Sequence, residues 1–521
     1  MQIKLSNHSK TEAINICFGE KASFFKKISK EYSLDEGAKC YIEENYEYLV
    51  DLWSRFSRKK TKNLDSIFYY SSPLLSGIGY PPQYIISLGI ILYNKKKLKS
   101  KKVTLHTQRP ELISYYLNKK KISKIFDLYS FFKVFSFIAT YLVAKCFLTT
   151  PEKNKKTILV HSNHTESFFK PEKGYLTSKV PDLSLLEKEK GYTILYDINP
   201  NFFRFFDILK FNRRKIVYAP VYLSFLEILS ICFQSVIFTI KTYFLWKSFY
   251  FSVDHVYSQI FFNILKRKSI VAMLRQFNDD YKYIMPWEKR GFQLGVECDL
   301  NSENLLNYEC GLLSKVTSEY HSYRYLRHTP SATLIAMSRE VAAFLSKSGP
   351  YNEISIVKSP RVFCLKAKKN GGINNDAVLV ICPSDEAHTE MMLTGAFDTQ
   401  HRFKIKIKLH PYCKLKVDKK YLEPRPLVSC LSDYSVAVCS GITTASTEAY
   451  LAGLKIYRFN NPNWLSFDTL DGIDVRNISF FTEIEDDFEN IEGQKKELMN
   501  YYLGINEIDF VSFLNQIASE K

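Results

Sequence analysis

The sequence predicts an α/β fold made of two Rossmann-like domains. Short apolar runs of strand length alternate with longer helical patterns along most of the chain, which is typical of parallel sheets with helices on both faces. This alternation begins a second time after a polar linker at 367–376. The length of 521 residues also exceeds what one hydrophobic core normally supports. We therefore expect two domains rather than one.

The first part of the chain divides into three expected regions. Residues 1–60 form an N-terminal α/β extension, with a strand at 14–18 and a helix at 42–56. Residues 61–300 form the first Rossmann-like domain, and residues 301–376 connect it to the second. The expected strands of the first domain are 103–106, 158–161, 192–196, 215–218 and 270–274.

The second Rossmann-like domain is expected at 377–521. Its expected strands are 377–382, 403–409, 428–430, 435–439 and 454–459, and its expected helices are 385–397 and 445–451. Three strands end at polar or turn-forming residues, namely Pro383-Ser384-Asp385, His410-Pro411 and Ser440-Gly441. Because open α/β sheets bind ligands at the carboxyl ends of their strands, these three ends predict the binding site.

Composition narrows the class of partner. The net charge of +18 favours an anionic partner, which could be nucleic acid, a membrane surface or a phosphorylated substrate. The positive charge is spread along the chain and forms no recognisable basic-aromatic module, so nucleic-acid binding is kept only as an alternative.

The cysteines and the N-terminus both favour the cytoplasm. The 11 cysteines occur singly, without a C-x-x-C pair, as in proteins of a reducing compartment. The first residues lack the apolar core of a signal peptide. We expect a cytoplasmic protein without a zinc or disulfide framework.

Two aromatic-rich segments interrupt the strand and helix alternation, at 131–148 and 222–251. The longest uncharged run in the second segment, Ile228 to Ile240, is shorter than the roughly 20 residues that a spanning helix needs. Two interpretations stay open, interfacial amphipathic helices and core helices of a large domain. Lysine clusters at 95–102 and 119–124 are solvated faces or attract an anionic membrane. Under the membrane interpretation, the protein makes a peripheral contact with the inner face of the cytoplasmic membrane.

The turn after the expected strand 435–439 carries several hydrogen-bond donors. Gly441 allows a phosphate to approach the backbone, and the hydroxyls of Thr443, Thr444 and Ser446 lie beside the start of a helix. The alternative is an ordinary Ser/Thr helix cap.

A second donor cluster ends the expected strand 403–409. Lys408 offers an ammonium group, His410 offers an imidazole, and Pro411 fixes the exit of the chain. A single histidine is more often structural, but two such clusters within one Rossmann-like half indicate a phosphate site.

These residues resemble a group of bacterial enzymes. Lys-x-His-Pro, followed by a strand that ends in Ser-Gly-x-Thr-Thr-x-x-x-Glu-Ala, is similar to the nucleotide-binding domain of GT-B glycosyltransferases of surface polysaccharide and lipopolysaccharide assembly. The pair resembles that of sialyltransferases and Kdo transferases, which use CMP-sugars, and that of teichoic-acid polyol-phosphate transferases, which use CDP-donors. The resemblance covers about residues 377 to 460.

The resemblance implies a GT-B fold with two domains facing a central cleft and extra helices in the N-terminal half. It also implies a donor site with no metal and no cofactor. The donor-site residues it implies are Lys408, His410, Pro411, Ser440, Gly441, Thr443, Thr444, Ser446, Glu448 and Ser384.

A shorter stretch resembles proteins of surface carbohydrate biosynthesis. It consists of Pro286-Trp287-Glu288, with Tyr320-His321-Ser322 further along the chain. Glycosyl transfer needs a base or nucleophile, and the candidates are Glu288, Asp280 and Asp279, against the alternative that they are solvated loop charges. Tyr281 stands where the sialyltransferases have glycine after their acidic pair. His321 and His161 are the candidate acceptor-binding residues.

The expected function is therefore a metal-independent glycosyltransferase that uses a nucleotide-activated sugar, with CMP-sugars such as Kdo or sialic acid favoured. The acceptor is expected to be a lipid-linked or oligosaccharide precursor of a cell-surface glycan. The alternatives are a CDP-polyol phosphotransferase of teichoic-acid type and a basic nucleic-acid-binding protein.

Overall fold

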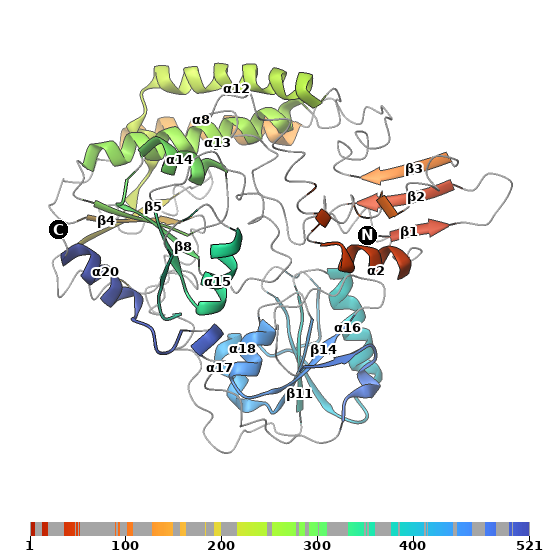
Figure 1. The fold of residues 1–521 in the computed structure, drawn as a ribbon. Coiled ribbons are helices and arrows are strands. Elements are labelled where there is room, and N and C mark those ends of the chain that lie inside the picture. The colour runs from red at the N-terminus through yellow and green to blue at the C-terminus, as the bar shows by residue number, and fades with distance from the viewer. Residues whose placement is uncertain are drawn as a thin grey trace.

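The described strands of the protein form three sheets, of three, seven and five strands (Figure 1). The structure is a computed structural model, and it describes residues 2–5, 13–18, 36–46, 48–49, 52, 89, 92–93, 102–107, 128–148, 157–162, 183, 192–198, 216–246, 253–277, 281–286, 291–300, 302–309, 332–348, 351, 354–359, 377–383, 386–410, 413, 415–440, 445–460, 475–485, 500–502 and 504–519. The expected helix 42–56 is described only in part.

The smallest sheet lies near the N-terminus. β1 (Gln2–Leu5) pairs antiparallel with β2 (Ala13–Phe18), and β3 (Lys102–Thr107) pairs parallel with β2. The helix α2 (Glu36–Glu44) follows β2 in the chain. The strand expected at 103–106 therefore exists, but it pairs with the N-terminal extension rather than with the strands expected beside it.

The largest sheet is entirely parallel and has the order β10-β9-β8-β7-β4-β5-β6. Its strands are β4 (Thr157–Ser162), β5 (Thr193–Ile198), β6 (Ile216–Val217), β7 (Tyr281–Pro286), β8 (Leu305–Glu309), β9 (Thr333–Ala336) and β10 (Ile354–Ile356). Counted along the chain, this order is the Rossmann order with one further strand. The sheet includes strands from the region expected to connect the domains, because β8, β9 and β10 continue the ladder that begins with β7.

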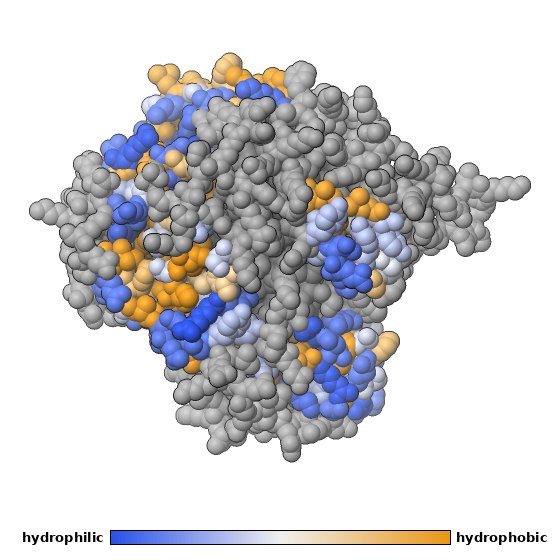
Figure 2. Space-filling view, in the orientation of Figure 1, coloured by the Kyte–Doolittle hydropathy of each residue, from blue (hydrophilic) through white to orange (hydrophobic). Residues whose placement is uncertain are grey.

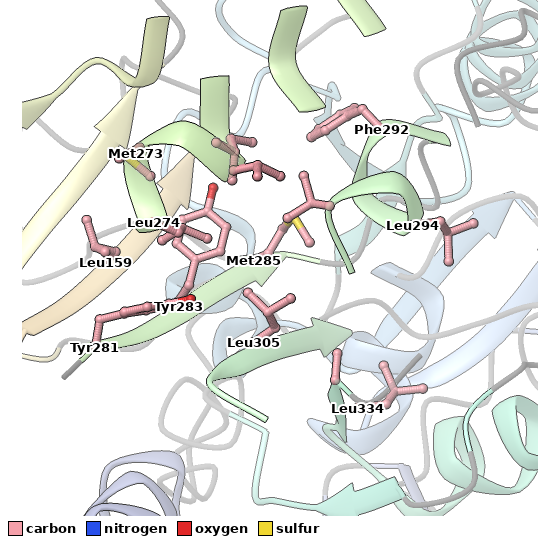
Figure 3. Packing of buried hydrophobic residues seen from close by; sticks show 14 of the residues in the cluster. Leu159, Met273, Leu274, Tyr281, Tyr283, Met285, Phe292, Leu294, Leu305 and Leu334 are labelled. Atoms are coloured by element: carbon pink, nitrogen blue, oxygen red, sulfur yellow. The ribbon is translucent and has the colours of Figure 1, made fainter. Parts of the chain in front are cut away.

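Helices cover one face of the seven-stranded sheet. Side chains of β4, β5, β7, β8 and β9 pack there against α13 (Val253–Leu274), α14 (Gly291–Leu300) and α15 (Arg339–Ser348). Figure 3 shows Tyr283, Met285 and Leu305 pointing from the strands toward Leu274 and Phe292 of the helices. Strand side chains alternate between faces, so the neighbouring residues of each strand point to the other side of the sheet.

The other face of this sheet is covered by the last helix of the chain, α20 (Phe510–Ser519). The ring of Phe510 lies 4.5 Å from that of Tyr308 between centroids, and Leu514 is buried in the same cluster. The chain therefore leaves the seven-stranded sheet, builds the five-stranded sheet and returns.

Three long helices form a layer beside the seven-stranded sheet (Figure 1). They are α8 (Leu128–Phe147), α12 (Phe225–Trp246) and α13, and a short 3₁₀ turn, η3 (Ala219–Tyr222), precedes α12. Phe137 of α8 contacts Phe261 and Phe262 of α13 edge-on, at 5.7 and 5.9 Å between ring centroids. Ile228 and Ile231 of α12 are buried in the same cluster. Within the described residues, no helix combines the length and apolarity needed to cross a bilayer.

The five-stranded sheet is also entirely parallel, with the order β12-β11-β13-β14-β15. Its strands are β11 (Ala377–Ile381), β12 (Lys404–Lys408), β13 (Val436–Ser440), β14 (Lys455–Phe459) and β15 (Arg476–Ile478). The helices α16 (Glu386–Asp398) and α18 (Ala445–Leu451) connect strands. Buried β-branched and aliphatic runs build both faces, as in other sheets covered on two sides.

The turn from α18 into β14 depends on one glycine. Gly453 has φ of 94°, its N–H donates to the Tyr450 carbonyl at 2.8 Å, and the Leu454 N–H donates to the Ala449 carbonyl at 3.1 Å. This Schellman arrangement satisfies the last carbonyls of the helix and favours glycine, since it has no Cβ to clash at positive φ. Three residues therefore separate the end of the helix from the start of β14.

Two expected strands are helical. Residues 270–274 are the last turn of α13, and residues 428–430 lie in the short helix α17 (Leu427–Cys430). A short apolar run has the same appearance in a buried strand and in a buried helix, and only the surrounding 22-residue helix distinguishes them. The strand that occupies the expected place in the first sheet is β7.

The expected α/β class with parallel, Rossmann-like sheets is confirmed by the two large sheets. The limits expected at 60 and 300 are not marked by a change of sheet, whereas 377 coincides with the first residue of β11.

Candidate functional site

Each large sheet has a point where the strand order reverses. In the seven-stranded sheet the chain builds β4, β5 and β6 in one direction and then β7 to β10 in the other. In the five-stranded sheet it builds β11 and β12, and then β13 to β15 in the other direction. Open α/β sheets bind ligands outside the carboxyl ends of the strands at these reversals. The two candidate positions are thus the ends of β4 and β7, and the ends of β11 and β13.

The end of β11 lies between the two predicted donor clusters. Ile381 is paired with Lys408 of β12 on one side and with Cys439 of β13 on the other. His410 follows β12 by two residues, and Ser440 is the last residue of β13. The parallel ladder therefore brings these candidate residues to one edge, next to the reversal.

Lys408 is engaged with the backbone. Its Nζ donates to the carbonyls of Glu423 and Arg425, the first at 3.3 Å. The segment that carries these carbonyls is itself held by Arg425, whose guanidinium binds both carboxylate oxygens of Glu423 and also Asp433. An ammonium group has three hydrogens, so one remains for a further acceptor.

His410 is half-buried, and burial lowers its pKa below the usual 6.5. At neutral pH the imidazole is therefore mostly uncharged and offers a hydrogen bond rather than a positive charge. A bound phosphate would favour the protonated form.

Ser440 and Ser446 are buried, and Glu448 is partly exposed on α18. Ser440 ends β13, and Ser446 and Glu448 lie in the helix that follows. The remaining predicted donor residues lie outside the described residues, namely Ser384, Pro411, Gly441, Thr443 and Thr444.

At the reversal of the seven-stranded sheet, His161 near the end of β4 pairs with Asp197 near the end of β5. The distance from His161 Nδ1 to Asp197 Oδ2 is 2.8 Å, and both side chains are almost fully buried. Asp197 also accepts a hydrogen bond from the Tyr283 hydroxyl at 3.0 Å and from the Ala219 N–H at 3.4 Å. Burial, and secondly the charge of Asp197, hold the pKa of Tyr283 well above its usual range.

These contacts fix the state of the imidazole. An ionised carboxylate only accepts, so the hydrogen between His161 and Asp197 is on Nδ1. In the neutral imidazole Nε2 is then an acceptor, and it has no hydrogen-bond partner among the described residues. The rings of Phe292 and Tyr283, at 6.0 and 6.2 Å between centroids, flank the imidazole. This arrangement suits acceptance of a proton by Nε2.

The sequence interpretation included His161 but missed its partners. Asp197 is the one carboxylate in the apolar strand Thr193–Ile198. A charged residue in a strand whose other residues are mostly apolar indicates a buried polar contact, and this was the available signal. Tyr283 carried no such signal, because a tyrosine in a strand is ordinary.

The other predicted residues of the first half lie outside the described residues, namely Glu288, Asp280, Asp279 and His321. β7 separates the acidic candidates in the sequence, since Asp279-Asp280 come before its first residue and Glu288 comes after its last. The last residue of β7 lies at the carboxyl edge that also carries the end of β4, and its first residue lies at the opposite edge.

A second buried polar cluster lies between α14 and β8. Asn307 Nδ2 donates to Glu297 Oε1 at 2.6 Å, and the Tyr351 hydroxyl lies 3.1 Å from both carboxylate oxygens. Burial raises the pKa of Glu297 to about 8, and the two hydrogen bonds only partly oppose this. In the described part of the chain, no group of three or more His, Cys, Asp or Glu side chains is arranged to hold a metal ion.

Comparison with known proteins adds no relative to this picture. No protein-family model matches the chain, and no curated protein matches it at significant similarity.

Proposed function

We propose that the protein is a GT-B-type glycosyltransferase that moves a sugar from a nucleotide-activated donor, with a CMP-sugar favoured, to a cell-surface glycan acceptor. The observation that carries the proposal is that each of the two parallel sheets has polar candidate residues at the carboxyl edge beside its strand-order reversal. The return of α20 to the first sheet is compatible with two domains that work as one unit.

In this proposal the five-stranded half binds the donor. Ser440 and His410 hydrogen-bond the phosphate that joins nucleotide and sugar. The ammonium group of Lys408 supplies positive charge there and donates its third hydrogen to the phosphate. Positive charge and hydrogen-bond donors at this position stabilise the leaving phosphate as the bond to the sugar breaks.

The seven-stranded half binds the acceptor and supplies the base. Because His161 Nε2 is buried, the proposal requires the sheet edge to open to the acceptor. Nε2 then takes the proton of the acceptor hydroxyl while the oxygen attacks the anomeric carbon, and the nucleotide leaves with the bonding electron pair. Asp197 positions the imidazole and stabilises the positive charge that it gains, as a carboxylate does beside other catalytic histidines. Glu288 is the second candidate for the base.

A thermal-shift panel with CMP, CDP, UDP and GDP tests the donor site. A nucleotide at 100 times its Kd stabilises the folded protein by about 2.7 kcal/mol. Stabilisation by CMP supports the proposal as stated, whereas stabilisation by CDP alone favours a polyol phosphotransferase. Failure of all four would overturn the donor site, and tight, steeply salt-dependent binding of random DNA in their place would favour nucleic-acid binding.

A matched pair of variants makes the panel specific. Ser440 and Ser435 are buried serines at opposite ends of the same apolar strand region. Ser440→Ala should lose most of the nucleotide-dependent stabilisation, while Ser435→Ala should keep it. Equal responses of the two variants would place the nucleotide elsewhere.

The base is tested by the pH dependence of transfer. His161→Gln and Glu288→Gln are compared in kcat/KM over a pH series, because loss of the base removes the acidic limb of the profile. If a variant keeps the acidic limb of the wild-type pH profile, the residue it replaces is not the base.

A further inference from the structure

The helix α12 turns an apolar face to solvent. Most of the exposed large hydrophobic side chains in the described part of the chain lie on α12 or α8. The outer face of α12 consists of Phe225, Leu226, Leu229, Phe233, Val236, Ile237 and Ile240. These residues recur at the three- and four-residue spacing of one helix face, and Figure 2 shows them as an orange rim along the top of the molecule, where α12 lies.

The inner face of α12 packs against the two neighbouring helices. Ile228, Ile231 and Phe238 are buried against α8 and α13. The hydroxyls of Ser235 and Thr239, also on the inner face, donate to the carbonyls of Ile231 and Ser235 at 2.7 Å each. Both faces of α12 carry apolar side chains. A rotation of the helix that buried the outer face would therefore expose the side chains that now pack against α8 and α13.

The helix α8 carries a second exposed apolar face. Phe132, Phe135, Leu142 and Phe147 are exposed, with Phe132 at 63% and Phe135 at 64%. Their spacing again follows one side of the helix, and the opposite side packs on α13 through Phe137 and Tyr141. Exposed apolar patches of this extent mark interaction surfaces in soluble proteins.

The charges beside these faces are positive. Lys133 on α8 and Lys241 on α12 are exposed, and α8 contains no acidic residue. Glu227, the one acidic residue of α12, is held at the helix start, where it accepts hydrogen bonds from Ser224 N–H and Oγ at 2.7 and 2.8 Å. Lysines 119, 120, 121 and 124 precede α8 in the sequence, and the whole chain has a net charge of +18.

We infer that the outer face of α12, together with the exposed face of α8, is a docking surface for an anionic phospholipid bilayer. Both helices lie in the plane of the lipid headgroups with their aromatic and aliphatic side chains inserted, while the lysines contact the anionic headgroups. The net charge argues against a second copy of the chain as the occupant, because two chains that each carry a net charge of +18 repel each other. This inference is independent of the proposed sugar transfer.

Co-sedimentation of the full chain with vesicles tests the surface. The double variant Leu226→Gln/Phe233→Gln changes two side chains that are 76% and 68% exposed, so the fold is expected to be retained. Phe480→Gln is the matched control, since Phe480 is 66% exposed and lies in the five-stranded half. Vesicles of phosphatidylcholine with phosphatidylglycerol, and of phosphatidylcholine alone, are compared at low and high salt.

The wild-type protein should sediment with the anionic vesicles, and the double variant should bind them on the order of tenfold more weakly or worse, with Phe480→Gln unchanged. Binding should fall with salt and with removal of the anionic lipid. Equal binding of the three proteins, or no binding by the wild type, overturns the inference. A third result would also overturn it: the wild-type protein dimerises with rising concentration in the absence of lipid, and the double variant does not. That result would assign the surface to a second copy of the chain.

Discussion

Glu297, in the half with the seven-stranded sheet, and Glu423, in the half with the five-stranded sheet, are both buried, but their pKa values are displaced in opposite directions. Burial raises the pKa of Glu297 to about 8, because its partners Asn307 and Tyr351 are neutral. Hydrogen bonds from Arg425, foremost, and from Tyr434 lower the pKa of Glu423 to about 2.

The two candidate histidines also differ in their surroundings. The Nδ1 atom of His161 lies 2.8 Å from a buried carboxylate oxygen of Asp197, whereas His410 is half-buried and burial lowers its pKa. Under the proposed function, this contrast fits a first half that transfers a proton and a second half that binds the anionic donor.

The largest effect is expected for Asp197→Asn. The amide keeps the shape of the carboxylate but no longer fixes the hydrogen on His161 Nδ1 or stabilises a positive imidazole. By analogy with serine proteases, kcat for sugar transfer should fall on the order of 10³- to 10⁴-fold. Tyr283→Phe is the control, because it removes one hydrogen bond and leaves the carboxylate with His161. A fully active Asp197→Asn protein would contradict the proposal that the half with the seven-stranded sheet supplies the base.

Glu423→Gln should lower the free energy of unfolding by about 2 kcal/mol at pH 7, since it weakens charge-assisted hydrogen bonds from Arg425. The folded-state pKa of Glu423 lies below the ordinary value of 4.5, so its contribution is complete above pH 4.5 and is lost as the pH falls toward 2. Denaturant unfolding of both proteins over a pH series measures this. Glu485→Gln removes an exposed pair with Arg476 and should change stability little. A pH-independent difference for Glu423→Gln would contradict the assignment.

His410→Gln should weaken nucleotide binding about tenfold, which corresponds to one charge-assisted hydrogen bond. Because the pKa of His410 is lowered, wild-type binding should tighten as the pH falls through that lowered value, and the variant should lose this pH dependence. Calorimetric titrations at several pH values give both results. His401→Gln serves as the comparison, since His401 is exposed just before β12 rather than after it. Equal losses in the two variants would remove His410 from the donor site.

The smallest effect at neutral pH is expected for Glu297→Gln. A raised folded-state pKa means that the folded protein binds a proton which the unfolded chain has released, so wild-type stability should fall as the pH rises from 4.5 to about 8. The glutamine variant should lack this slope and should gain relative to the wild type toward pH 8. Thermal unfolding from pH 5 to 8.5 provides the measurement. Parallel curves for the two proteins would show that Glu297 is ionised throughout.

The sequence predicted the second half of the molecule more closely than the first. β13, α18 and β14 were expected within one residue of their limits, because turn-forming residues such as Gly453 bound short apolar runs. Residues 270–274 were placed in a strand because their apolar character, without the periodicity of the longer helix around them, does not distinguish the two structures.

The candidate site was predictable only where it is local in the sequence. The ends of β11, β12 and β13 follow from the alternation of strands and helices, and their adjacency follows from the parallel order. His161 contacts Asp197 of β5, and Asp197 in turn accepts hydrogen bonds from β7 and η3. The sequences of these segments do not indicate which strands are neighbours in the sheet. Pairings of this kind depend on the sheet order, which single-sequence patterns do not contain.

The return of α20 means that two stretches of chain, rather than one, join the halves. Where the two stretches meet the first half they are tied to it: the Lys358 N–H donates to the Ile508 carbonyl at 2.8 Å, and Arg339 of α15 pairs with Glu507 at 2.8 Å. Gly504, with φ of 59°, brings the returning stretch close to the Val357 carbonyl. Any hinge between the sheets must therefore bend both stretches together, which restricts the directions of opening. A cut after β15 would also strip α20 from the first half and leave Tyr308 and its neighbours without their cover.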